Sequence, residues 1–388
     1  MDKVKIAIIG VGTMGSAHVA TIDKLDNCTV SAICDINPEA LKKYANRKDT
    51  ALFATADELF AKGDFDAVIV AVPHYFHVPL ALQALEHGKH VLTEKPISVH
   101  KKLAQQLVDA IPKYPNLKVA AMFNQRTLNA HKKIKQLIDN GELGEIRRVN
   151  WIITTWFRSQ FYYDSGDWRA SWRGEGGGML LNQCPHQLDL MQWFFGMPNK
   201  VTAFLTLGKY HDIEVEDEVT AYLEYPNGAT GVFITTTGEA PGTNRLEICG
   251  ERGRLVYESG KINFLRNEIP TTEFRTTTKT HFGSPEKWEI NVPYKPDAKQ
   301  QHMNVIENFA NAILKDVPLI APAQEGIRGL ELGNAMLLSG LKHKTVELPI
   351  DAEEFSVMLD ELVAKSRYVK KAPVEKDNVD AASLAGSF

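Results

Sequence analysis

The sequence predicts an α/β protein in two parts: a doubly wound parallel sheet, followed by a part built on a large, mostly antiparallel sheet. Up to about residue 123, short apolar runs alternate with amphipathic stretches, whereas later apolar residues recur at every second position. The length of 388 residues exceeds one ordinary domain and suits two. We therefore expect domains at 1–123 and 124–369, with a polar tail at 370–388.

The first part contains short apolar runs, rich in β-branched residues, that are typical of strands buried on both faces. These runs are Val4–Ile9, Val30–Cys34, Ala67–Val72, His90–Leu92 and Lys118–Met122. The helical stretches between them are Thr13–Leu25, Pro38–Ala45, Phe76–His87 and Val99–Ile111. Strands and helices that alternate in this way specify a parallel sheet covered by helices.

The second part begins with a helix at Thr127–Asp139, which Asn140-Gly141 ends. Period-two strands follow at Arg147–Trp156, Val201–Leu207, Val219–Tyr225, Ala229–Thr237 and Leu246–Cys249. Pro226-Asn227-Gly228 predicts a hairpin turn. Helices return at Gln301–Leu314 and Gln324–Leu341, and we expect them to pack back against the rest.

Composition excludes several classes of protein. The 44 basic and 48 acidic side chains give a formal charge of −4, which argues against a nucleic-acid partner. No segment approaches the roughly 18 apolar residues of a membrane span. The apolar run at Ile6–Ile9 is too short for a secretory signal, and the four cysteines form no C-x-x-C pair. We expect a cytoplasmic protein with reduced thiols.

The first strand runs into Gly10-Val11-Gly12-Thr13-Met14-Gly15, and a helix follows. Gly10 permits a tight turn, Gly12 lets the backbone approach a pyrophosphate, and Gly15 lets helix and strand pack closely. Thr13 and Met14 open the helix, whose N-terminus attracts negative charge. In this strand–turn–helix context the motif predicts a dinucleotide site.

Asp35 stands at the end of the second strand, twenty residues after Gly15. Its carboxylate can accept hydrogen bonds from both ribose hydroxyls and would repel a 2′-phosphate. The neighbours Ile36 and Asn37 offer no positive charge to counter that repulsion. NAD is therefore predicted over NADP.

Two other strand ends face the same edge of the sheet. Pro73, His74 and His77 follow one of them, and we expect cofactor contacts or helix capping there. No carboxylate or thiol stands near these histidines at ligand spacing, so no metal is predicted. Glu94 and Lys95 precede Pro96 at the other strand end, where a charged pair is either functional or merely exposed.

A glycine-rich stretch, 176–178, leads into Asn182, His186 and Asp189. Pro185 requires a helix to begin close to Asn182, and Gly196 should end it. If this turn is helical, the three polar side chains form one stripe. A histidine at a helix N-terminus stays neutral, as a general base must be. A zinc site at this stretch would lack a fourth ligand. The other alternative is that the stretch only begins a helix and takes no part in a reaction.

Seven aromatic residues lie within 156–172, well above the chain average of 9%. Tyr162, Trp168 and Trp172, with Arg169 among them, are predicted to form a wall against a sugar ring, because aromatic faces stack on its C–H groups. The arginines at 158, 169 and 173 could instead recognise a carboxylate or phosphate. The sequence leaves this choice open.

These motifs resemble the Gfo/Idh/MocA oxidoreductases, named for glucose–fructose oxidoreductase, inositol dehydrogenase and a rhizopine-catabolism protein. The resemblance is carried by Gly10–Gly15, by EHGKHVLTEKP ending at Pro96, by NQR at Asn124–Arg126 and by GEGGGMLLNQCPHQLD at Gly174–Asp189. It implies a Rossmann domain joined to an α/β domain with a large open sheet, a nicotinamide cofactor near Gln125 and a polyol substrate. It also implies that Lys95 and His186 are catalytic.

Many dehydrogenases of that family carry aspartate where this chain has Asn182. We expect an NAD-dependent dehydrogenase acting on a secondary hydroxyl of a sugar, glycoside or cyclitol, with His186 as base and Lys95 stabilising negative charge, or with these roles exchanged. Asp189 either orients His186 or anchors the helix. A redox-neutral enzyme that retains NAD and a non-catalytic regulator are the alternatives. We expect a homodimer or homotetramer built on the second sheet.

Overall fold

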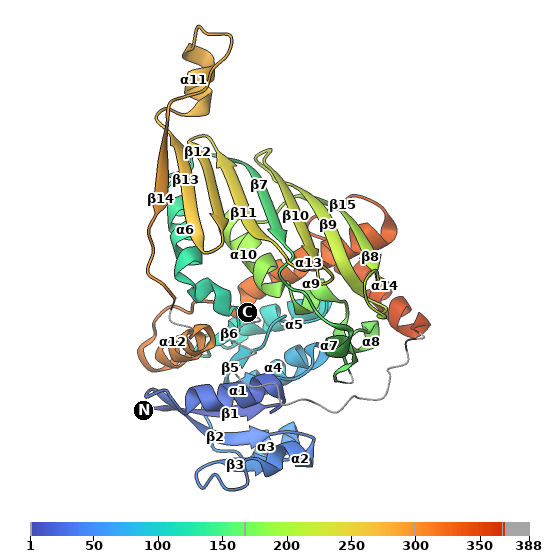
Figure 1. Ribbon diagram of the computed structural model, residues 1–388. Helices are drawn as coiled ribbons and strands as arrows, with labels where there is room; N and C mark the ends of the chain where they lie inside the picture. Colours follow the sequence, from blue (N-terminus) through green and yellow to red (C-terminus); the bar gives the residue numbers. More distant parts are fainter. Residues whose placement is uncertain (1, 167, 298–299, 367, 369–388) are drawn as a thin grey trace.

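The computed structural model describes residues 2–166, 168–297, 300–366 and 368, so the predicted tail at 370–388 lies outside the described residues. Two sheets organise this part of the chain, one parallel and one mostly antiparallel (Figure 1). The predicted α/β fold is therefore confirmed.

The first sheet has six parallel strands in the order β3-β2-β1-β4-β5-β6. Its strands are β1 (Val4–Ile9), β2 (Cys28–Cys34), β3 (Ala51–Phe53), β4 (Ala67–Val70), β5 (His90–Thr93) and β6 (Val119–Ala121). Its helices are α1 (Thr13–Ile22), α2 (Pro38–Lys42), α3 (Ala56–Lys62), α4 (His77–Glu86) and α5 (Lys101–Ala110). The sequence analysis missed β3 and α3, although Thr55 caps α3 by accepting from the Glu58 N–H.

The second sheet has nine strands in the order β14-β13-β12-β11-β7-β10-β9-β8-β15. They are β7 (Ile146–Ile153), β8 (Lys200–Leu207), β9 (Glu216–Glu224), β10 (Thr230–Thr236), β11 (Asn244–Gly250), β12 (Gly253–Glu258), β13 (Lys261–Asn267), β14 (Lys287–Val292) and β15 (Val346–Glu347). Among the described pairings β7 and β10 run parallel and the rest antiparallel. The turn predicted at 226–228 joins β9 to β10, with Gly228 at φ 83°.

Long helices cover one face of this sheet: α6 (Asn129–Asp139), α10 (Pro185–Phe195) and α13 (Ala323–Lys342) (Figure 1). The core under them includes Trp151, Phe233 and Leu246, each at most 1% exposed. On the opposite face Phe204 is 71% exposed and Tyr222 43%. The alternation of buried and exposed residues therefore leaves one sheet face without a helix layer.

The end of the chain returns to the first sheet. Helix α12 (Gln301–Lys315) packs on α1 and β1, with Ile306 and Phe309 buried in the same core as Ile6 (Figure 1). Helix α13 contributes Ile327 and Leu330 to the core on the other face of that sheet. The predicted helices at 301–314 and 324–341 thus both pack against the first sheet, and α13 also packs on β8 of the second.

The remaining helices are short or peripheral. They are η1 (His74–Phe76), η2 (Ile111–Lys113), η3 (Asn124–Thr127), α7 (Gln160–Asp164), α8 (Trp172–Glu175), α9 (Met179–Asn182), α11 (Thr271–Thr277) and α14 (Ala352–Lys365). Helix α11 projects beyond the far end of the second sheet (Figure 1). Across the described ranges, no helix is long and apolar enough to cross a membrane.

Candidate active site

A cavity of about 670 Å³ lies between the carboxyl edge of the first sheet and the helices of the second part. Both halves of the chain line it, as predicted for a site at the ends of parallel strands. The sequence-predicted residues on its wall are Gly10, Gly12, Thr13, Met14, Asp35, Ile36, Pro73, His74, Glu94, Lys95, Tyr162, Trp168, Arg169, Asn182 and His186.

Five other predicted site residues lie outside the cavity lining. Gly15 packs against the turn, and His77 is 1% exposed, with ring nitrogens 2.7 and 2.8 Å from the carbonyls of Pro96 and Val72. Gln125, Trp172 and Asp189 are also buried behind the wall. Gln125 accepts a hydrogen bond from Gln187, and Trp172 belongs to the core. These side chains support the wall rather than form it.

The glycine turn is shaped to admit a phosphate. A Cβ on Gly10 would meet the Ala71 carbonyl at 2.4 Å, and one on Gly15 would meet the Gly10 carbonyl at 1.8 Å. At Gly12, by contrast, nothing lies within 4 Å. Gly12 is the N-cap of α1 and supplies no capping side chain, so the first N–H groups of the helix face this open space. The residues present therefore fit a dinucleotide pyrophosphate.

Two backbone N–H groups fix the Asp35 carboxylate at the neighbouring strand end. Its Oδ2 accepts from the Val11 N–H at 2.8 Å and its Oδ1 from the Asn37 N–H at 2.8 Å. Each carboxylate oxygen has a second lone pair, which leaves room for two ribose hydroxyls. Ile36, beside it, is 88% exposed and carries no charge.

Glu94 lies on the cavity wall and bonds to a buried histidine. Its Oε1 lies 2.7 Å from Nε2 of His18 on α1, and both side chains are buried. Burial alone would raise the pKa of Glu94, but the His18 bond and the nearby His302 and Lys95 outweigh it and hold the pKa at about 2. Glu94 also accepts from the Lys95 N–H at 3.1 Å, so it fixes the backbone that carries the lysine.

Lys95 joins the two halves of the site. Its Nζ donates to the backbone carbonyl of Asn182 at 2.7 Å. Burial lowers the pKa of Lys95 to about 8; Arg158 and Arg169 push it in the same direction, while Glu94 and Glu175 oppose them. The ammonium can therefore lose its proton close to neutral pH.

His186 stands in the first turn of α10, which begins at Pro185. Its side chain is 2% exposed and lies on the cavity wall. Burial holds the pKa of His186 well below its usual range, and the nearby Lys95 and His302 add to the effect. The imidazole is therefore neutral at physiological pH, which is the state that a general base needs.

Asn182 ends α9, one short turn before α10, so the predicted continuous helical stripe is interrupted. Its amide donates to Glu175 Oε1 at 2.5 Å and to the Tyr162 hydroxyl at 3.2 Å. Pro185 imposes the break, because its ring cannot lie inside a continuous helix. Asn182 and His186 still reach the same cavity.

Asp189 faces away from that cavity. Its two oxygens accept from Arg126 Nε at 2.7 Å and Arg126 Nη2 at 2.6 Å, with both side chains 1% exposed. Arg126 also pairs with Glu325 at the start of α13. The geometry supports the anchoring alternative, because this bidentate pair ties α10 to η3 and α13.

Aromatic and guanidinium groups form the wall opposite the glycine turn. The Arg169 guanidinium lies 4.5 Å from the ring centroids of both Tyr162 and Trp168, and it donates to the Tyr162 hydroxyl at 3.0 Å. Arg158 lies 5.1 Å from the Tyr162 ring and also lines the cavity. Arg173 is exposed and lies outside the lining. Such a wall can stack on a ring and bind hydroxyls or an anionic group.

Sequence reasoning did not select several lining residues as site residues. His302 comes from α12, over 100 positions after His186, and only the return of the chain brings it here. Gln183 adjoins the predicted Asn182, so proximity in sequence was a usable signal, and Arg158 was predicted only as one of three arginines that could recognise a carboxylate or phosphate. The wall near Asp35 is completed by apolar and amide side chains of the third and fourth helices and η1: Ala56, Phe76, Pro79, Leu80 and Gln83.

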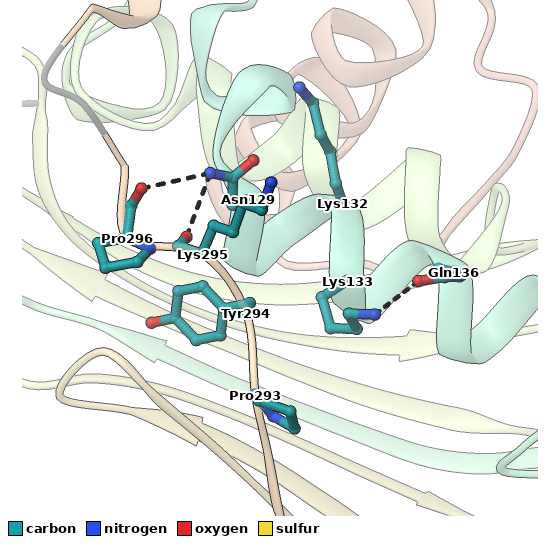
Figure 2. Close-up of a pocket in the computed structure, with 8 residues that line it drawn as sticks. All are labelled: Asn129, Lys132, Lys133, Gln136, Pro293, Tyr294, Lys295 and Pro296. Carbon is teal, nitrogen blue, oxygen red and sulfur yellow. Dashed lines mark hydrogen bonds between the residues drawn. The ribbon is translucent and has the colours of Figure 1, made fainter.

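A second hollow, of about 810 Å³, lies far from this chemistry, between α6 and the segment after β14 (Figure 2). The Asn129 amide donates to the carbonyls of Lys295 and Pro296 there, and Lys133 donates to Gln136. The Asn129 bonds fasten the segment to the helix, and among the described residues that line the hollow none is acidic. Despite its larger volume, it lacks paired functional groups and is not the candidate site.

The described part of the chain holds no group of three His, Cys, Asp or Glu side chains placed to bind a metal ion. A phosphate-binding helix, an acid at the next strand end and two proton-transfer groups, Lys95 and His186, share one cavity. This combination defines a dinucleotide-dependent oxidoreductase.

Comparison with known proteins identifies the family. Residues 4–121 match an oxidoreductase family with an NAD-binding Rossmann fold, and residues 131–256 match the GFO/IDH/MocA C-terminal domain. The chain belongs to the Gfo/Idh/MocA family of oxidoreductases, and its cofactor is NAD.

The relatives include sugar and cyclitol dehydrogenases. Levoglucosan dehydrogenase of Pseudarthrobacter phenanthrenivorans is 26% identical, with 90% of this chain and 99% of the relative covered. Myo-inositol 2-dehydrogenase of Thermotoga maritima is 22% identical over 89% and 98% of the two chains. The structure of the WlbA dehydrogenase of Bordetella pertussis with NADH and UDP-GlcNAcA matches with a TM-score of 0.75, 25% identity and coverage of 90% and 100%.

Proposed function

We propose that this protein is an NAD-dependent dehydrogenase that oxidises a secondary hydroxyl of a sugar, glycoside or cyclitol. One observation carries the proposal: Lys95, at the strand end beside the dinucleotide cradle, bonds to the backbone of Asn182 in the cavity that His186 also lines. The proton-transfer groups and the cofactor cradle thus share one enclosed space.

NAD, when bound, supplies the acceptor for the hydride that leaves the substrate carbon. Gly12 and the N-terminus of α1 would hold its pyrophosphate, and Asp35 its ribose. Residues 1–123 would thus form the cofactor-binding domain and 124–369 the substrate-binding domain. Helix α12 packs across this proposed boundary.

His186, kept neutral by burial, is our candidate for the base that takes the hydroxyl proton. The Lys95 ammonium would donate a hydrogen bond to the same oxygen as negative charge grows on it. With its pKa at about 8, Lys95 can also exchange roles with His186. Asn182, with both amide hydrogens committed, offers its Oδ1 to a second substrate hydroxyl.

The substrate ring would lie against Tyr162 and Trp168, with Arg169 gripping its hydroxyls or an acidic group. Trp172, buried in the core, supports that wall from behind. The names of the relatives above, which act on levoglucosan and myo-inositol, favour a polyol over other alcohols.

A substrate screen tests the proposal. Purified protein, NAD⁺ and a panel of sugars, sugar acids, glycosides and inositols should give growth of the NADH absorbance band with at least one compound. The control is Lys95→Met, which removes the ammonium and keeps most of the length of the unbranched side chain. Conversion of a compound without net NADH release would favour the redox-neutral alternative, and binding of NAD without any conversion would favour the regulator.

We also propose a homodimer or homotetramer built on the bare face of the second sheet. Phe204 and Tyr222 stand on that face, and an uncovered apolar surface favours self-association. Light scattering at micromolar concentration should give a multiple of the 43.3 kDa chain mass. Phe204→Glu should shift the mass toward the monomer, whereas Phe282→Glu, at an exposed phenylalanine outside the sheet, should not.

A further inference from the structure

Glu175 is a buried carboxylate inside the catalytic region, and the function proposed above does not use it. It ends α8, directly before the glycine stretch, and is 1% exposed. Its Oε1 accepts from the Asn182 amide at 2.5 Å and its Oε2 from the Ala170 N–H at 2.8 Å. The His74 ring bonds to its backbone carbonyl at 3.2 Å. The two donors fix the carboxylate, the His74 bond fixes the backbone that carries it, and burial of the carboxylate requires compensation by such donors.

The carboxylate determines which way the Asn182 amide points. An ionised carboxylate only accepts hydrogen bonds, so the NH₂ group must face Glu175. The other amide hydrogen reaches the Tyr162 hydroxyl. The Oδ1 of Asn182 is thereby fixed as an acceptor in the cavity. Without the negative charge, the amide could turn over and present donors instead.

The same carboxylate acts on Lys95 through space. Lys95 bonds to the backbone of Asn182, whose side chain bonds to Glu175. The charges around the ammonium come from several elements. Arg158 and Arg169 disfavour it from the second part, Glu94 favours it from its own strand end, and Glu175 favours it from α8. The buried neighbours His74 and His186 are neutral, because burial holds the pKa of each well below its usual range.

We propose that Glu175 is a positioning residue of the reaction: it orients the Asn182 amide toward the substrate and, together with Glu94, supplies negative charge that favours the ammonium form of Lys95. The inference rests on the proposed function for its meaning in catalysis. Its electrostatic part concerns the protein alone and can be measured without turnover.

Glu175→Gln removes the charge and keeps the size of the side chain. Competitive labelling with acetic anhydride across a pH series, followed by mass spectrometry, gives the protonation midpoint of Lys95. The exposed Lys48 serves as the internal reference. We expect a midpoint near pH 8 in the wild type and a lower one in Glu175→Gln, by up to about one unit, because one of the two opposite charges near Lys95 is lost while Glu94 remains.

Glu216→Gln is the matched control. Glu216 is also buried and bonds to the same glycine stretch, accepting from the Gly178 N–H at 2.8 Å and the Leu180 N–H at 3.0 Å. Burial raises the pKa of Glu216 to about 7, and it makes no bond to Asn182. Its replacement should leave the Lys95 midpoint in place.

Moving the negative charge from position 175 to its hydrogen-bond partner at position 182 gives a second test. Asn182→Asp alone places two carboxylates in contact, so one of them should take up a proton. The double variant Glu175→Gln with Asn182→Asp reverses the pair while keeping one charge. We expect it to return the Lys95 midpoint to the wild-type value. Glu175→Asp, which keeps the charge, should also stay close to wild type.

Two outcomes overturn the inference. In the first, the Lys95 midpoint of Glu175→Gln equals that of the wild type or of Glu216→Gln. In the second, the Lys95 midpoint of the double variant is no closer to the wild-type value than that of Glu175→Gln. If Glu175→Gln fails to fold, the double variant is measured instead. A Lys95 midpoint equal to the wild-type value would then support the inference, and a lowered midpoint would contradict it. Failure of the dehydrogenase screen leaves these measurements intact. Conversely, if the protein is an active dehydrogenase but the Lys95 midpoint does not move in Glu175→Gln, only this inference is wrong and the proposed function stands.

Discussion

Replacing Asp189 by asparagine should destabilise the protein without changing its chemistry. Asp189 and Arg126 form a bidentate ion pair with side chains 1% exposed, and Arg126 keeps Glu325, 34% exposed, as a second partner. Breaking a buried pair by removing one partner costs about 3–5 kcal/mol, because the remaining charge stays buried. Since Glu325 still neutralises Arg126, we expect the lower end, about 3 kcal/mol.

Calorimetry measures the loss of stability, and steady-state kinetics measure whether the chemistry changes. At about 2 °C for each kcal/mol in a chain of this size, Asp189→Asn should lower Tm by about 6 °C. Its pH–rate profile should match that of the wild type. The control Glu325→Gln removes the more exposed partner and should cost about 1 kcal/mol or less.

The opposite pattern would refute this reasoning. If Asp189→Asn kept a normal Tm but lost most of its turnover, and if the acidic limb of its profile moved, the carboxylate would have to act on His186. Asp189 would then belong to the catalytic machinery rather than to the anchor of α10.

Three more predictions concern the cavity. Asp35→Ser should narrow the preference for NAD⁺ over NADP⁺ in calorimetric titrations, because it removes the charge that repels a 2′-phosphate; equal binding by the unmodified protein would be contrary evidence. Gly12→Ala should keep Tm but weaken NAD⁺ binding, whereas Gly15→Ala should lower Tm, since its Cβ would lie 1.8 Å from the Gly10 carbonyl. If the Lys95 ammonium must donate, the rate of oxidation should fall above a pKa of about 8; if Lys95 is the base, the rate should rise through it.

Local patterns were enough to predict the fold class and the phosphate cradle. The glycine turn is determined by contacts within one strand–helix unit, and Gly10 and Gly15 occupy sites that exclude a Cβ. The hairpin at Gly228 needed only its turn residues. The strands β12 to β15 were missed. In β13, Ile262 and Phe264 are buried at alternate positions, but the apolar Leu265 and the charged Arg266 then break the alternation.

The contacts that determine side-chain roles are long-range, and sequence reasoning could not supply them. Asp189 is three residues from His186 in sequence, yet it bonds to Arg126, 63 positions earlier. His302 reaches the cavity only because α12 returns to the first sheet. Glu175 belongs to the glycine-rich motif, but nothing local in the sequence indicates that its carboxylate meets Asn182.

The turnover of His186→Ala and Lys95→Ala, compared with their affinity for NAD⁺, is the most direct measurement. If these residues transfer the proton and stabilise the oxygen of the substrate, each variant should lose roughly 10²–10⁴ in kcat while its Kd for NAD⁺ stays near that of the wild type. Near-normal turnover in both variants would contradict the assignment of this cavity as the catalytic site.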